Sequence, residues 1–292
     1  MSLITISNEV LTVTLDTAGA VFHSIQKDGV EYLWQGSEKY WKFRDKNLFP
    51  YIGRMTDGCY LLGDQKFPMP LHGFAPGSEF AVTEQSESAV TFTLTESEET
   101  LGMYPFTFRF DIAYSLSGAS ITKRCKVTNT GSEEMFFGLG SHPGFNVPLG
   151  GDGAFEDWYF EFDESSSPVR IGFDPANYRL SDINLPYALE DEKRLRLAHT
   201  LFDNDAIVLQ GMPKTVTLKS DSSDRSVRVS YPGMNFLGLW HMPKTDAPYV
   251  CIEPWLSLPS HSAYMEDLSK QAYLCHLPAG EEYSNEILFE LA

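Results

Sequence analysis

The segment FTFRFDIAYSL, residues 106–116, places an aromatic or aliphatic side chain at every second position. Because successive side chains of a β-strand point to opposite faces, this alternation predicts a half-buried strand. Short turn sequences containing glycine, such as SGA at 117–119 and LGD at 62–64, separate it from further segments of the same kind. Together these segments predict an all-β fold, a large antiparallel β-sandwich. The other segments are LTVTL (11–15), AVTFTL (89–94), WYFEF (158–162), KTVTLKS (214–220) and RSVRVSY (225–231).

The segment rich in proline and glycine at 140–153 is the best candidate for a domain boundary. Strands of the same kind resume directly after it, which favours one continuous sandwich. We therefore expect residues 1–292 to form a single domain. Helical patterns are few and short, and they predict helices only over 37–43 and 189–197.

Charge and composition exclude several classes of partner. The chain has 22 Lys and Arg against 40 Asp and Glu, a net charge of −18, which repels nucleic acid and anionic lipid. Four scattered cysteines are typical of buried thiols in a reducing compartment. No apolar run approaches the roughly 18 residues of a membrane helix, and the N-terminus lacks a signal-like basic region. These features predict a cytoplasmic protein that is a monomer or a homodimer.

Three stretches place ionisable residues where the strand pattern does not require them. His72 lies in LHGF, His142 lies in SHPG, and Glu253 lies in the apolar run YVCIEPW. An imidazole titrates near neutral pH, and an apolar setting strengthens the affinity of a carboxylate for a proton. The three residues therefore form a candidate set for general acid–base catalysis. A structural histidine beside a proline, or a glutamate that meets a buried arginine, would give the same pattern.

Two histidines and a glutamate are also possible metal ligands, but no HExxH motif or helical i, i+4 spacing is present. Nucleotide-binding glycine loops and a GxSxG serine are absent from the sequence as well. We therefore expect no metal site and a reaction that needs neither a nucleotide nor a covalent serine intermediate.

Five motifs in series resemble those of the aldose 1-epimerases, and in particular their LacX-like branch. They are the opening strands with EYLWQG (31–36), LFPYIGRM (48–55), LHGFA (71–75), GSHPGF (140–145) and CIEPW (251–255). The resemblance covers nearly the whole chain in the same order. It implies a galactose mutarotase-like supersandwich that interconverts the α and β anomers of a sugar without a cofactor.

The resemblance also implies roles for individual residues. Glu253 corresponds to the general base at the C1 hydroxyl, and His142 to the general acid at the ring oxygen. His72 corresponds to a second histidine that forms a hydrogen bond near that oxygen. Arg54 matches an arginine that holds substrate hydroxyls, and Asp205, with Asp203 as the alternative, matches an aspartate of the site.

Trp240 is a candidate sugar-stacking residue, although a tryptophan among apolar neighbours is more often part of a core. Other functions stay open at this point. A hexose 6-phosphate epimerase would need cations at the site, for which Lys46, Arg54 and Lys244 are the candidates. A non-catalytic sugar-binding sandwich and a glycoside hydrolase with two carboxylates are further alternatives.

Overall fold

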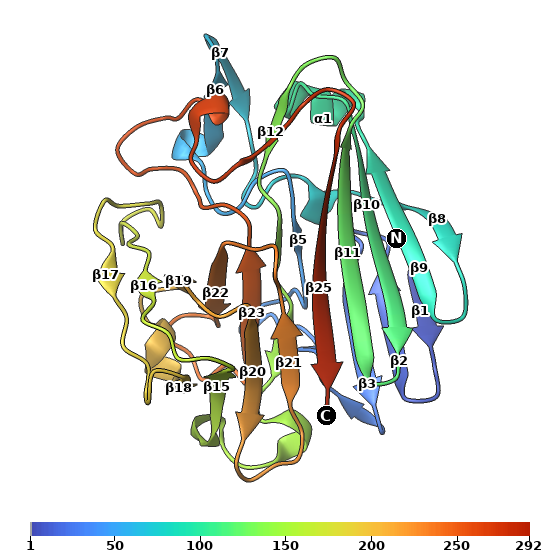
Figure 1. The fold of residues 1–292 in the computed structure, drawn as a ribbon, viewed down its shortest axis with the longest axis vertical. Helices are drawn as coiled ribbons and strands as arrows, with labels where there is room; N and C mark the ends of the chain where they lie inside the picture. The colour runs from blue at the N-terminus through green and yellow to red at the C-terminus, as the bar shows by residue number, and fades with distance from the viewer. Residues whose placement is uncertain (1) are drawn as a thin grey trace.

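A computed structural model describes residues 2–292. Most of the named strands belong to two large β-sheets, and every pairing between the named strands is antiparallel. Figure 1 shows the long strands β25, β11, β10 and β9 side by side. In spatial order the nine-stranded sheet contains β18 (Arg194–Arg196), β15 (Trp158–Phe162), β20 (Thr215–Ser220), β21 (Val227–Ser230), β25 (Glu282–Leu291), β11 (Ser120–Asn129), β10 (Phe108–Ser117), β9 (Ala89–Thr95) and β8 (Ala81–Gln85).

The second sheet includes the strands on which Trp240 and Glu253 lie. Its order is β17 (Leu185–Pro186), β16 (Val169–Arg170), β19 (Ile207–Gln210), β22 (Phe236–Trp240), β23 (Tyr249–Trp255), β13 (Gly140–Ser141) and β5 (Asn47–Leu48), and β14 (Gly144–Asn146) also pairs with β23. Smaller sheets contain β1 (Leu3–Ser7), β2 (Leu11–Asp16), β3 (Val21–Lys27) and β4 (Val30–Glu31), then β12 (Met135–Phe137) with β24 (Cys275–Leu277), and β6 (Cys59–Leu62) with β7 (Gln65–Pro68).

The two large sheets share one apolar core, as expected for a sandwich. On β10 the alternate residues Phe108, Phe110 and Ile112 are fully buried. Leu237 of β22 and Ile252 of β23 belong to the same cluster of buried side chains. Phe49, which follows β5, stacks on Phe110 with their ring centroids 4.5 Å apart. The prediction of a large antiparallel β-sandwich is therefore confirmed.

Both predicted helices are wrong. Residues 37–43 form turns and irregular chain, and the segment 189–197 contains strand β18. In β18 the central Leu195 is buried, and the strand pairs with Tyr159–Glu161 of β15. Ladder hydrogen bonds to a neighbouring strand outweigh a local helical pattern of this length. Within the described residues, the one α-helix is α1 (Glu98–Met103), which begins at a capping box formed by Ser97 and Thr100.

The alternation of β23 decides which of its residues belong to the core. Val250 and Ile252 point into the core between the sheets. Cys251, Glu253 and Trp255 have the opposite parity, so they lie on the other face of the strand. Glu253 therefore projects away from the inter-sheet core, although its neighbours in sequence are apolar.

Candidate active site

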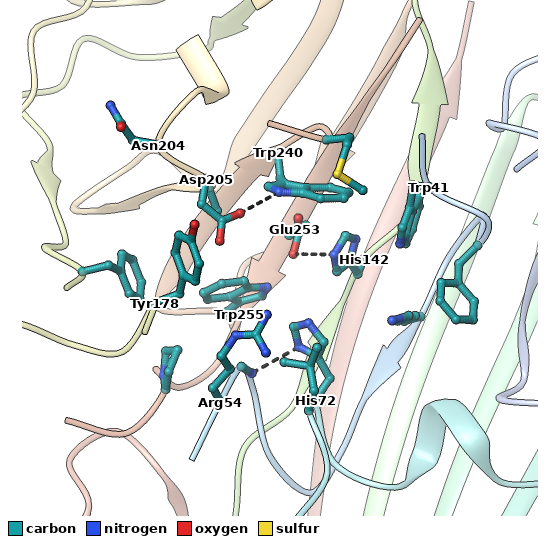
Figure 2. Close-up of a pocket in the computed structure, with 18 residues that line it drawn as sticks. Trp41, Arg54, His72, His142, Tyr178, Asn204, Asp205, Trp240, Glu253 and Trp255 are labelled. Atoms are coloured by element: carbon teal, nitrogen blue, oxygen red, sulfur yellow. Dashed lines mark hydrogen bonds and ion pairs between the residues drawn. The ribbon is translucent and has the colours of Figure 1, made fainter. Parts of the chain in front are cut away.

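A cavity of about 320 Å³ lies over the face of the second sheet that carries Glu253. All six site residues expected from the sequence line it, as Figure 2 shows. They are Arg54, His72, His142, Asp205, Trp240 and Glu253. Segments far apart in the chain therefore contribute to one cavity, which can surround a small ligand with polar groups on an apolar lining.

The floor of the cavity holds an imidazole and a carboxylate in contact. His142 Nε2 lies 3.4 Å from Glu253 Oε2, and the two side chains are 8% and 2% exposed. The backbone N–H of His142 donates to the Lys46 carbonyl over 3.0 Å. The His142 ring stacks on Trp41 with their centroids 4.9 Å apart, and Trp240 meets it edge-on at 5.6 Å. Strand pairing and aromatic packing together fix the direction of the imidazole.

Burial shifts the pKa values of Glu253 and His142 in opposite directions. It raises the pKa of Glu253 well above its usual range, and the negative charge of Asp205 raises it further. Burial lowers the pKa of His142, and the neighbouring His72 and the positive charge of Lys46 add to that effect. Both pKa shifts favour the neutral forms, a protonated Glu253 and an unprotonated His142, and because the two groups are in contact they titrate as a unit that shares one proton.

His72 enters the cavity from a strained turn. Its backbone φ is 67°, and its Nδ1 accepts a hydrogen bond from the Gly53 N–H over 3.1 Å. Burial, followed by the positive charges of Lys46 and Arg54, lowers the pKa of His72, so the ring is neutral. Because Nδ1 is an acceptor, the ring proton is on Nε2, which makes His72 a hydrogen-bond donor.

The turn that presents His72 depends on Gly73. Its φ is +76°, and a Cβ there would lie 2.2 Å from the Phe49 carbonyl oxygen. We expect Gly73→Ala to lower the free energy of unfolding by about 3 kcal/mol, since backbone strain and a clash with the backbone add. Urea denaturation measures the loss.

Gly63→Ala is the matched control, because Gly63 also has a positive φ of +60° but nothing lies within 4 Å of the position that its Cβ would take. It is expected to lose only about 1 kcal/mol. If the two variants lose the same free energy of unfolding, the clash between the added Cβ and the Phe49 carbonyl oxygen does not contribute to the loss.

Asp205 rather than Asp203 lines the cavity. Its Oδ1 accepts a hydrogen bond from the indole N–H of Trp240 over 2.7 Å, and this contact is drawn in Figure 2. Trp240 therefore holds the carboxylate of Asp205 and also packs against His142. Arg54 is exposed at the cavity, and its guanidinium lies 6.0 Å from the centre of the Tyr178 ring.

Sequence reasoning missed several lining residues. Trp41 stacks on the candidate acid, Tyr178 lies in irregular chain that carries no motif, and Asn204 lies in a turn. Trp41 closely precedes the LFP motif and Asn204 lies between the candidates Asp203 and Asp205, so both positions offered a signal, whereas Tyr178 offered none. Of the three cations considered for a phosphate, Lys46 and Arg54 line the cavity and Lys244 is not among its lining residues.

The chain resembles known proteins over its whole length. Lactobacillus acidophilus has a galactose mutarotase related enzyme whose structure matches with a TM-score of 0.94 and 29% identity, covering 100% of this chain and 97% of that one. A galactose mutarotase-like protein from Lactobacillus casei matches with a TM-score of 0.94, 31% identity and 100% coverage of both chains. The fold and the cavity thus define an all-β protein of the galactose mutarotase-like class.

The family follows from the sequence comparison. The model of the aldose 1-epimerase family matches residues 2–290. The plasmid-encoded protein LacX of Lactococcus lactis subsp. lactis is 34% identical over 264 residues, which are 87% of this chain and 88% of that protein. This chain belongs to the aldose 1-epimerase family. Membership supports a mutarotase-type function, that of an isomerase acting on sugars.

Within residues 2–292, no helix is both long enough and apolar enough to cross a membrane.

Proposed function

We propose that this protein is an aldose 1-epimerase that interconverts the α and β anomers of a free hexose. The observation that carries the proposal is the contact between His142 and Glu253, 3.4 Å apart at the floor of a cavity. Opening a hemiacetal requires one group that removes a proton and another that delivers one. This pair supplies both, and the apolar lining shields the transfer from water.

The reaction starts after the proton that burial favours on Glu253 has passed to His142 across their 3.4 Å contact, which leaves Glu253 as a carboxylate. Glu253 removes the proton of the C1 hydroxyl, and the electron pair of that O–H bond forms the carbonyl. The bond between C1 and the ring oxygen breaks, and His142 protonates the ring oxygen. Rotation about the C1–C2 bond turns the other face of the aldehyde to the ring hydroxyl. The same two groups, acting in reverse, close the other anomer and regain their starting protonation.

His72 supports the same step as a neutral donor. Its Nε2–H is free to form a hydrogen bond with the ring oxygen, because Nδ1 accepts from Gly53. The ring centroids of His72 and His142 lie 5.7 Å apart, which is close enough for both to face one hemiacetal. Donors held in place before the reaction stabilise the charge that develops on the oxygen.

Arg54, Asp205 and Trp240 bind the sugar in this proposal. Arg54 donates to hydroxyl groups and Asp205 accepts from them, while Trp240 orients Asp205 through the indole N–H. The pair of His142 and Glu253 holds one proton and is neutral as a whole, so the other acidic and basic residues of the lining are Lys46, Arg54 and Asp205. A hexose 6-phosphate is therefore the alternative substrate, and inhibition by inorganic phosphate separates it from a free hexose.

A single set of measurements tests the proposal. Freshly dissolved α-glucose and α-galactose are followed by polarimetry or by NMR exchange, with and without the protein. We expect the protein to accelerate anomer exchange for at least one of them. The alternative outcome is that calorimetry detects binding of a sugar, but the anomers of every common aldose exchange at their spontaneous rate. That result would identify a non-catalytic sugar-binding sandwich. Competitive inhibition by inorganic phosphate would favour a phosphorylated substrate.

We further propose that residues 1–292 act as one domain, since a single cluster of buried residues includes side chains from Ile6 to Leu291.

A further inference from the structure

Cys251 lies beside the acid–base pair and has no role in the proposed reaction. Its Sγ, one ring nitrogen of His142 and one carboxylate oxygen of Glu253 all lie within 4.8 Å of one another, and all three residues are buried. We propose that these three side chains form a site for a thiophilic divalent cation, Zn²⁺ or Cd²⁺, and that the bound cation blocks the cavity to sugar.

The chemistry of the three donors selects this class of ion. A thiolate, an imidazole and a carboxylate are the side chains that bind Zn²⁺ in proteins, whereas Mg²⁺ and Ca²⁺ require oxygen ligands. Bonds of about 2.0–2.2 Å at a tetrahedral angle put nitrogen and oxygen ligands roughly 3.4 Å apart. The His142 Nε2 and Glu253 Oε2 atoms lie at 3.4 Å. The Cys251 Sγ, which lies within 4.8 Å of a ligand atom of each of the other two residues, supplies the third ligand by closing on the ion.

Paired strands hold the three ligands in place. Cys251 and Glu253 are two residues apart on β23, so both point to the same face. His142 lies between β13 and β14, and β14 pairs with β23 through Gly144 opposite Cys251. A rigid framework of this kind lowers the entropic cost of binding a metal. His142 and Glu253 both line the cavity, which gives an ion its path from solvent and leaves its fourth position open to water.

Binding of the ion displaces two protons to solvent, the thiol proton of Cys251 and the proton that His142 and Glu253 share. The ion then occupies the lone pairs with which His142 and Glu253 would accept a proton. Neither group can take part in acid–base catalysis while the metal is bound. This inhibitory consequence rests on the proposed function, but the metal site itself rests only on the three side chains.

Cd²⁺ titration of the full chain tests the site without reference to activity. A bound thiolate gives an ultraviolet charge-transfer band, and we expect that band to saturate with one Cd²⁺ in the wild type. Cys251→Ala should lose the band and bind Cd²⁺ at least about tenfold more weakly. Cys275→Ala removes a thiol from β24, outside the candidate site, and is expected to behave as the wild type does. Cys251→Ser repeats the test with the side-chain volume kept.

The proposal is overturned if Cys251→Ala and Cys251→Ser, both folded by circular dichroism, bind Cd²⁺ as tightly as the wild type and keep the band. It is also overturned if the wild type shows no thiolate band.

Inhibition is measured separately. Zn²⁺ is expected to slow anomer exchange by the wild type and by Cys275→Ala, with full recovery after a chelator is added, while Cys251→Ala stays active at the same Zn²⁺ concentration. A protein that binds Cd²⁺ through a thiolate but never accelerates anomer exchange would support the metal site and overturn the proposed function. The two proposals can therefore fail independently.

Discussion

We expect Glu253→Gln to lower kcat for anomer exchange by about a thousandfold, the scale of a lost general base. The amide keeps the volume and the hydrogen-bonding capacity of the side chain, but it cannot accept the proton of the C1 hydroxyl. The KM should change little, because the glutamine side chain would fill the same place at the cavity floor. NMR exchange with the best aldose substrate measures both constants.

We do not expect Glu253→Gln to lower the free energy of unfolding. Burial raises the pKa of Glu253, so ionising it inside the protein is unfavourable, and a neutral amide avoids that cost. Glu282→Gln is the matched control, since Glu282 is a half-exposed carboxylate that pairs with Lys126 on the surface. If kcat falls no more in Glu253→Gln than in Glu282→Gln, Glu253 is not the general base.

His142→Gln should cost nearly as much, about a hundredfold to a thousandfold in kcat. Glutamine can donate a hydrogen bond to the ring oxygen but cannot transfer a proton to it. His276→Gln is the control, because the side chain of His276 is 45% exposed and belongs to β24. A rate for His142→Gln equal to that of this control would contradict the assignment of His142 as general acid.

The pH dependence separates a proton-transfer role from a purely structural one. In the wild type, activity requires one proton on the pair, so the rate should fall both at low pH, where a second proton binds, and at high pH, where the shared proton is lost. In His142→Gln only Glu253 still titrates. Its rate should rise with pH through the raised pKa of Glu253 and then stay level. The double variant should lose no more than the worse single variant, because the two groups act as a unit.

Local sequence predicted the strands well where one face is buried. The alternation at 106–116 corresponds to β10, Phe108–Ser117, and WYFEF coincides with β15. The helix predicted over 189–197 was wrong, because the three residues of β18 form their hydrogen bonds with β15. Pairing with a distant strand leaves no trace in so short a window.

Among the residues of the candidate site, some were also predictable from the local sequence and others were not. His72, His142 and Glu253 stand out because an ionisable residue in an apolar or glycine-rich stretch breaks the local pattern. Tyr178 lies in irregular chain with no periodicity to break, so only the folded chain brings it to the cavity.

By itself the sequence determined which faces of the strands are apolar, and hence the all-β class, and it singled out the residues able to exchange protons. The tertiary structure decided that His142 and Glu253 touch, and which carboxylate, Asp205, joins them. The physical reason is that contact depends on strand register: the pairing of Gly144 with Cys251 brings two segments about a hundred positions apart to one cavity. The opposing pKa shifts follow from the burial of this pair, which is a property of the assembled sheets.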